Sequence, residues 1–216
     1  PGVAVTYSSD FKFFAFPGVD IGYQLHPNVR VYGNVGYTYR VPTFTDLNYK
    51  SPTTIGNPDL EPEKAFSQEI GLKWNTARFN ATMAVFNRDS NGLIDYVKMQ
   101  NTDPWQPHNI QDVTTKGFET QLNYMFTLNS YNQKLQLGYS FIEDTVKQNT
   151  YNFSQYSVNS LKHQVVGSCH MQFLKNVTNS ILYRYSERTD GDSYAVVDLG
   201  AAYTLSAFEF SLFANN

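Results

Sequence analysis

Apolar and polar residues alternate with a period of two along most of this chain. The alternation is clearest in residues 29–40, where odd positions are mostly apolar or aromatic and even positions are mostly polar. A run of this kind predicts a β-strand, and its length is about twice that of an ordinary strand. A strand tilted by about 40° rises roughly 2.5 Å per residue, so about ten residues cross an apolar band of roughly 25 Å. The pattern therefore predicts a membrane-spanning strand with lipid on one face and water on the other.

The same alternation recurs along the chain and predicts about ten strands in hairpin order. The predicted strands cover approximately residues 19–26, 29–40, 66–74, 79–99, 118–126, 134–141, 164–173, 180–186, 197–203 and 208–215. Short turns alternate with long connections, and in transmembrane barrels the long loops lie on the outer side. The predicted outer loops cover residues 41–65, 100–113, 144–161 and 187–193. Residues 1–16 show little pattern beyond an aromatic cluster before Pro17, which could be the interfacial end of a strand.

A soluble β-sandwich also alternates, so the apolar face could instead form a buried core. Two features favour the membrane. The predicted strands are repeatedly longer than those of soluble sheets. Their polar faces are rich in Gly, Ser, Thr, Asn and Gln and carry only scattered charges. We therefore predict an all-β fold, an antiparallel transmembrane β-barrel to which this chain contributes about ten strands.

Composition agrees with this fold and excludes several classes of function. Of 216 residues, 16% are aromatic, with 16 Tyr and 16 Phe, as two interfacial belts would require. No apolar run has the length of a transmembrane helix. The net charge of −3 and the absence of a basic stripe argue against a nucleic-acid partner. Cys169 has no internal disulfide partner and lies on an apolar face, where it acts as a small hydrophobic residue.

Candidate catalytic and metal motifs are weak. Residues 89–95 resemble the start of a calcium loop, but Gln100 stands where the twelfth-position Glu would be needed. We interpret this run as a bulge or extension of a strand, and residues 190–192 as a turn. No nucleophile elbow, P-loop or zinc motif is found. We predict no enzyme activity, no metal site and no cofactor.

Three segments carry a family resemblance. Residues 39–47 (YRVPTFTDL), 56–64 (GNPDLEPEK) and 69–73 (EIGLK) resemble the signature of TonB-dependent outer-membrane receptors. The resemblance implies a barrel of 22 strands around an N-terminal plug domain, in the bacterial outer membrane. The chain starts at Pro1 without a signal peptide and ends while a strand is under way. We therefore expect residues 1–216 to be part of the barrel domain, without the plug.

The resemblance also implies partners and a function. The expected partners are outer-membrane lipid, the receptor's own plug, the TonB energy-coupling complex, a small nutrient ligand and, in some receptors, a surface lipoprotein. The function would be import of cobalamin or a ferric siderophore, with cobalamin slightly ahead. A self-contained porin-like or adhesive barrel, with its first and last strands paired, is one alternative. A soluble β-binding module is the other.

Two groups of residues are candidates for the transport site. Aromatic residues at the loop tips could enclose a flat, partly apolar ligand, or could simply pack the loops: Tyr49, Trp105, Tyr151, Phe153 and Tyr156. Charged residues of the lumen wall could face the plug, or could simply be hydrated: Arg30, Glu69, Lys73, Glu119, Lys134, Arg184 and Asp198. The loop of residues 41–64, here called the signature loop, is predicted to be architectural, with Asp59, Glu61 and Glu63 pinning it to the barrel.

Overall fold

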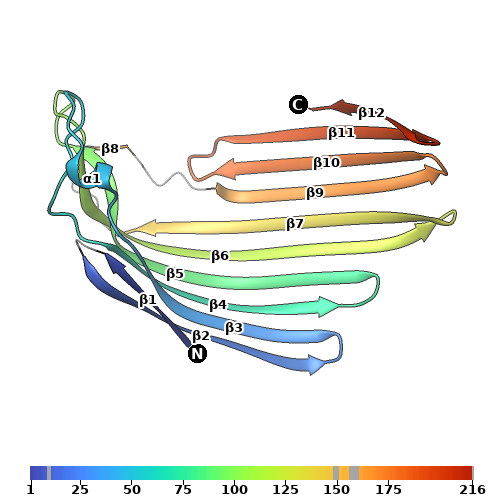
Figure 1. The fold of residues 1–216 in the computed structure, drawn as a ribbon, viewed down its shortest axis with the longest axis horizontal. Coiled ribbons are helices and arrows are strands. Elements are labelled where there is room, and N and C mark those ends of the chain that lie inside the picture. The colour runs from blue at the N-terminus through green and yellow to red at the C-terminus, as the bar shows by residue number, and fades with distance from the viewer. Residues whose placement is uncertain (9–10, 148–150, 156–160, 216) are drawn as a thin grey trace.

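The computed structural model describes residues 1–8, 11–147, 151–155 and 161–215, and these form one antiparallel sheet (Figure 1). The prediction of an all-β antiparallel fold is confirmed. The strands are β1 (Gly2–Ser8), β2 (Lys12–His26), β3 (Val29–Arg40), β4 (Glu63–Asn75), β5 (Phe79–Lys98), β6 (Gln106–Leu128), β7 (Tyr131–Val146), β8 (Phe153–Ser154), β9 (Leu161–Leu174), β10 (Val177–Arg188), β11 (Ser193–Leu205) and β12 (Phe208–Ala214). A short helix, α1 (Phe44–Asn48), follows β3.

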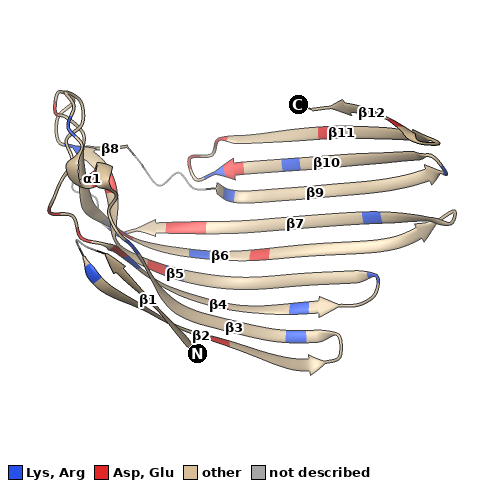
Figure 2. Ribbon diagram, viewed as in Figure 1, with Lys and Arg blue, Asp and Glu red and all other residues tan. Residues whose placement is uncertain are grey.

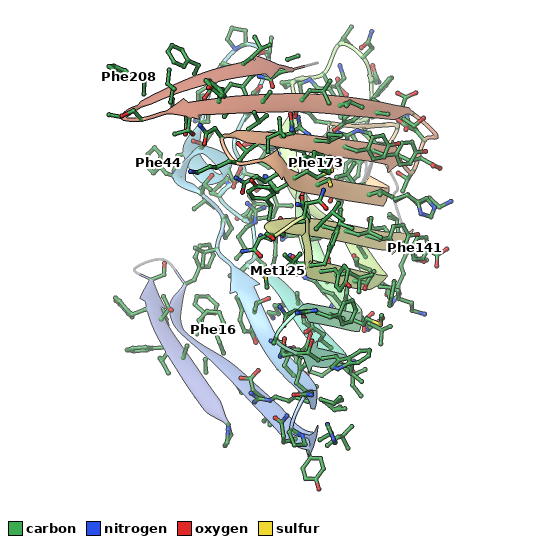
Figure 3. All side chains as sticks on the ribbon, turned by 90° about the vertical axis from the view of Figure 1, so that its right-hand side faces the viewer. Phe16, Phe44, Met125, Phe141, Phe173 and Phe208 are labelled. Atoms are coloured by element: carbon green, nitrogen blue, oxygen red, sulfur yellow. The ribbon has the colours of Figure 1, made fainter. Side chains whose placement is uncertain are left out.

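The sheet is an open, curved wall with β1 and β12 at its two edges (Figure 3). Neighbours in sequence are neighbours in space, except that β8 pairs with β5 and β7 pairs with β9. The short turns lie at one end, which we call the turn end, and α1, β8 and the long connections lie at the other, the loop end (Figure 1). Among the described strands β1 does not pair with β12, so the closed pairing of a self-contained barrel is not formed.

Two predictions from the sequence need correction. Residues 1–16 contain β1 and the start of β2, joined in register from Gly2 opposite Gly18 to Ser8 opposite Lys12. The adjacent pair Phe13–Phe14 interrupts the apolar alternation and hides this hairpin in the sequence. The second long loop was predicted to cover 100–113. However, β6 begins at Gln106, so the connection between β5 and β6 is only residues 99–105.

The apolar face of the wall, here called the outer face, is exposed. Ile70 is 58% exposed, Leu137 45% and Tyr183 39%, although a sandwich core would bury them. The few buried apolar residues are small or lie near the loop end: Leu60, Ala65, Ala81, Ala84, Ile94, Val97 and Val113. No second sheet packs on this face in the described structure, so the β-sandwich alternative is wrong. The described part of the chain holds no helix with the length and apolar character needed to cross a membrane.

Aromatic pairs form two belts on the outer face. Nearer the loop end, the Tyr37 and Phe66 rings are 4.7 Å apart and the Phe141 and His163 rings 5.1 Å apart. Nearer the turn end, Trp74 meets Phe79 at 5.1 Å and Tyr124 meets Phe126 at 5.4 Å. Phe141 points away from the wall (Figure 3). This arrangement is typical of the two interfacial girdles that flank the apolar band of membrane barrels.

The opposite, inner face is polar, and large side chains on it lie over glycines of the next strand. A Cβ added to Gly71 would lie 2.4 Å from the Tyr32 ring. One added to Gly117 would lie 2.2 Å from the Phe86 ring and 2.7 Å from the Phe141 carbonyl oxygen. Each glycine thus provides the space into which the neighbouring ring folds down, and the ring covers backbone that the glycine leaves bare.

We predict that Gly117→Ala destabilises the sheet, because both a ring and a backbone carbonyl must move. Overpacking of this kind costs about 1–3 kcal/mol. The matched control is Gly138→Ala, because the atom nearest to its added Cβ is 3.9 Å away. Urea unfolding of the detergent-solubilised protein, followed by circular dichroism, measures both. Equal midpoints for the two variants would contradict the prediction.

Candidate functional site

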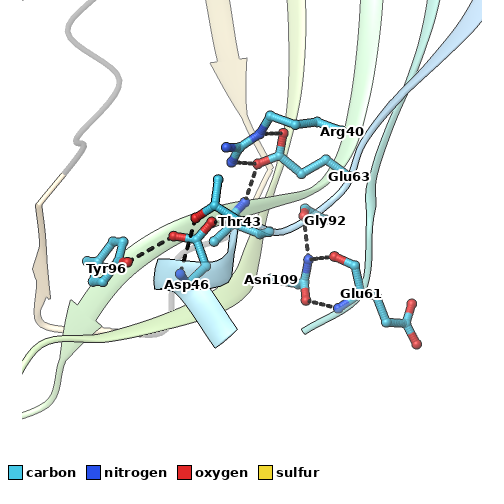
Figure 4. Close-up of polar contacts among 9 residues, drawn as sticks. Arg40, Thr43, Asp46, Glu61, Glu63, Gly92, Tyr96 and Asn109 are labelled. Carbon is cyan, nitrogen blue, oxygen red and sulfur yellow. Dashed lines mark hydrogen bonds and ion pairs between the residues drawn. The ribbon is translucent and has the colours of Figure 1, made fainter. Parts of the chain in front are cut away.

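The signature loop begins with a capped helix whose buried carboxylate organises the segment. The Thr43 N–H donates to Asp46 Oδ2 at 2.9 Å, and the Asp46 N–H donates to Thr43 Oγ1 at 3.2 Å, which completes a capping box (Figure 4). The Tyr96 hydroxyl of β5 donates to Asp46 Oδ1 at 2.8 Å. The Asn57 N–H donates to the Asp46 carbonyl at 2.8 Å. One aspartate therefore joins the helix, the rest of the loop and the sheet.

A second set of contacts fixes the end of the loop. Glu63 accepts from Arg40 Nε at 2.7 Å and from the Ile94 N–H at 2.8 Å (Figure 4). The Asn109 side chain donates to the Glu61 and Gly92 carbonyls at 2.8 and 2.7 Å and accepts from the Glu61 N–H at 2.8 Å. The loop therefore lies pinned against the β5–β6 hairpin.

The predicted pinning residues play unequal roles. The Glu63 carboxylate pins the loop as predicted, whereas Glu61 does so only through its backbone. The Asp59 carboxylate makes no hydrogen bond or ion pair with the part of the chain that the structure describes, so its predicted role is wrong. Sequence alone did not reveal Asn109, because an amide that replaces a backbone partner leaves no spacing signal.

Residues 89–95 form the strand irregularity that the sequence predicted. The register of β5 against β6 shifts between Ser90 and Leu93, and Gly92 has a φ of +64°. The Gly92 N–H donates to Asp112 Oδ1 at 3.0 Å. Asp89 accepts from the Thr114 hydroxyl at 2.7 Å, and Asp95 accepts from the Ser154 hydroxyl. Residues 190–192 form the predicted turn, closed from the Gly191 N–H to the Arg188 carbonyl at 3.1 Å.

Part of the connection between β7 and β9 pairs with the β5–β6 hairpin through β8. Val97 pairs with Ser154 and Lys98 with Phe153, and the Asn152 side chain donates to the Met99 carbonyl at 2.9 Å. The Lys98 ammonium lies 4.7 Å from the centre of the Trp105 ring and 5.4 Å from that of Phe153. It also donates to the Asn101 carbonyl at 2.9 Å. Lysine 98, which the sequence did not single out, is thus enclosed by two predicted ligand aromatics.

The other candidate aromatics lie apart from this cluster. The Tyr151 and His108 rings are 5.4 Å apart and tilted by 31°. Burial lowers the pKa of His108 and so favours its neutral imidazole. Tyr49 is the C-cap of α1 and is 47% exposed. Tyr156 falls outside the described residues. The structure therefore brings together Trp105 and Phe153, and leaves Tyr49 open to solvent.

Phe44 is an exposed aromatic that the sequence analysis did not select. It is 80% exposed at the start of α1, next to the capping Thr43. A capping threonine followed by an aromatic residue is a local signal that could have identified it, because the cap fixes the direction in which the first helical side chain points.

All seven predicted wall residues lie on the inner face, as the strand registers require. Lys73 lies 4.9 Å from the Tyr32 ring centre, Glu69 accepts from Asn34 at 3.3 Å, and Arg184 donates to Asp198 at 2.7 Å. Glu119 and Lys134 line two separate hollows, of about 550 and 710 Å³. One basic residue lies near the turn end of each of β3, β4 and β7 (Figure 2). The wall is thus a polar surface with isolated charges.

Comparisons with known proteins agree on one family. The family model described as TonB dependent receptor-like, beta-barrel, matches residues 1–216. The vitamin B12 transporter BtuB of Vibrio vulnificus (strain CMCP6) is 33% identical over 97 residues, which cover 45% of this chain and 14% of that protein. BtuB of Photobacterium profundum is 22% identical over 190 residues, 84% of this chain and 30% of that protein.

A solved structure has the same fold. The siderophore receptor PirA from Pseudomonas aeruginosa superposes with a TM-score of 0.76 and 16% identity, over 99% of this chain and 38% of that one. This chain therefore spans less than two fifths of the length of each of these three proteins.

We predict that acid loosens the signature loop. Burial by itself would raise the pKa of Asp46, but hydrogen bonds from Thr43 and Tyr96 and the Arg40 charge outweigh it and lower that pKa. A lowered carboxyl pKa stabilises the fold above the unfolded-state pKa of about 4, and the contribution is lost as pH falls through the folded value. Hydrogen-exchange protection of residues 43–48 should fall below about pH 4. In Asp46→Asn it should be lower at pH 6 and nearly independent of pH.

The control for this loop is Asp59→Asn, which should keep the pH response of the unaltered protein. An acid response that survives in Asp46→Asn would contradict the assignment.

We predict that Lys98→Met releases β8. The substitution keeps the length of the side chain and removes the cation–π contact with Phe153 of β8, which is worth about 0.5–1 kcal/mol. Hydrogen exchange of residues 151–155 should accelerate by roughly twofold to fivefold. Lys50→Met, at an exposed lysine of the signature loop, is the control and should leave this segment unchanged. Unaltered exchange in Lys98→Met would show that backbone pairing alone holds β8.

Proposed function

Because the chain belongs to the TonB-dependent receptor β-barrel family, we propose that it is part of an outer-membrane receptor that imports a scarce nutrient. The observation that carries this proposal is the distribution of side chains on the sheet. Its outer face is apolar and exposed, and its inner face is polar and lightly charged. Such a wall suits a protein with hydrocarbon outside and a hydrated lumen within. The polypeptide makes and breaks no bond; it binds the ligand and lets it pass.

The receptor's plug belongs to a different part of the polypeptide. Residues 1–216 form one section of the barrel, and the two open edges, β1 and β12, are where the remaining strands pair. The charged inner residues, with Glu119 and Lys134 beside their hollows, face the plug. TonB moves the plug, and the ligand passes along the wall. A lumen this polar and sparsely charged supports the proposal, because it offers hydrogen bonds to the plug that can be exchanged at low cost.

Cobalamin is the ligand that we favour over a ferric siderophore. Two relatives are vitamin B12 transporters, whereas the structural neighbour is a siderophore receptor with only 16% identity. The connections at the loop end also carry more acid than base. Their acidic residues are Asp46, Asp59, Glu61, Asp103, Asp190 and Asp192, and their basic residues are Lys50 and Lys147. This charge balance disfavours a polyanionic ferric catecholate complex.

Within the loop end, the exposed rings of Tyr49 and Phe44 are the first ligand contacts. Both are open to solvent and belong to the segment that Asp46 and Glu63 hold rigid. A rigid aromatic surface binds with little loss of conformational entropy. The ligand contacts three further aromatic rings only at the parts that Lys98 and His108 do not cover. These rings belong to Trp105, Tyr151 and Phe153.

The experiment is equilibrium binding by the complete receptor in detergent. We expect saturable binding of cyanocobalamin and none of ferric enterobactin, and Tyr49→Ala should weaken cobalamin binding by roughly fivefold or more. The control is Tyr131→Ala at the turn end, which should bind normally. Binding of the ferric siderophore alone would overturn the choice of ligand. Binding of neither compound, together with failure to fractionate with outer membranes, would overturn the transport proposal.

A further inference from the structure

The outer face contains a narrow groove along β9. On this strand two consecutive outward positions hold small side chains, Gly167 and Cys169. The strand register sets Leu137 and Tyr183 beside Gly167, and Leu135 and Ile181 beside Cys169. The larger residues on β7 and β10 therefore form two walls, with the small residues of β9 as the floor. The resulting groove has a volume of about 410 Å³.

The floor of the groove is open. A Cβ added at Gly167 would find no atom within 4 Å, whereas most strand glycines of this sheet meet a neighbouring atom within that distance. The groove extends toward Leu122, Tyr124 and Phe79 at the turn end. None of the described charged side chains lines it. It therefore offers dispersion contacts on three sides and almost no polar contact.

We propose that this groove binds one acyl chain of a membrane lipid. This proposal rests on the proposed function, because that function places the outer face in a bilayer. Gly167 lies between the belt that contains Phe141 and His163 and the belt that contains Trp74 and Phe79, and the groove reaches the second belt at Phe79 and Tyr124. At that depth the surroundings are hydrocarbon. A chain in the groove contacts the floor and both walls, whereas a chain on the flat face contacts protein on one side.

The width of the groove selects an acyl chain over a protein element. The strands that carry the two walls lie on either side of β9, each about 4.8 Å away, so their axes are roughly 10 Å apart. The side chains of the walls fill much of that width. A helix, about 10–12 Å across, does not fit between them, whereas a single methylene chain does. Because lipid tails are as apolar as leucine, shape complementarity rather than the hydrophobic effect must provide the preference.

The test uses the complete receptor in nanodiscs that contain a phospholipid with a diazirine near the middle of one acyl chain. After photolysis, peptide mapping compares labelling of residues 161–174 with that of other outer-face strands. We expect enrichment on β9 of roughly twofold to fivefold, because each carbon–carbon contact is worth only about 0.1–0.2 kcal/mol and the chain gives up contacts with neighbouring lipid tails when it enters the groove. Gly167→Leu should abolish the enrichment, and Cys169→Leu should reduce it.

Gly33→Leu is the matched control, because Gly33 also lies on the outer face, opposite Ile70, but outside the groove. It should retain the enrichment on β9. Even labelling of all outer strands in every variant would overturn the groove and leave the membrane assignment intact. Absence of labelling from every outer strand would overturn the membrane assignment as well. Labelling of the other outer strands but not of β9 would also refute the proposal, because it would mean that lipid does not enter the groove.

Discussion

The structure depends on the pairing of every strand with its neighbours along a continuous antiparallel ladder. In hydrocarbon an unpaired backbone amide costs several kcal/mol, so a polypeptide that meets lipid must satisfy these groups within the protein. Here the ladder is the main cohesive element, because the sheet encloses almost no apolar core and its large apolar side chains point outward. Side chains can then vary on both faces, provided that each face suits its surroundings.

At the loop end, polar side chains take over part of the role that backbone pairing has in the wall. Asp46 and Asn109 replace missing backbone partners of the signature loop, at Thr43 and Glu61. Glu63 does the same for the Ile94 N–H of β5. The long segment becomes ordered without regular structure apart from five residues of helix. Buried polar groups that are fully paired specify one conformation, which explains how a loop of this length can present a rigid surface.

The sequence predicted the strands of the wall well because lipid and water impose opposite demands on alternate residues. It failed where that demand is relaxed. Residues 1–16 alternate weakly beside the Phe13–Phe14 pair. The outer part of β6, residues 106–117, rises beyond the apolar band, although the strand predicted over 79–99 matches β5. In both places the strands pair with their neighbours although their sequences lack a clear period of two. The contacts around Lys98 and Asn109 join residues about fifty positions apart, and no local pattern reports them.

The enclosure of Lys98 by Trp105 and Phe153 has a thermodynamic consequence for recognition. These rings are already occupied by a charged group from the same chain. A solute that uses them must displace the ammonium, so its apparent affinity equals its intrinsic affinity multiplied by the fraction of molecules in which the rings are vacant. The lysine is thus an internal competitor, and it sets a threshold that weakly interacting solutes do not pass.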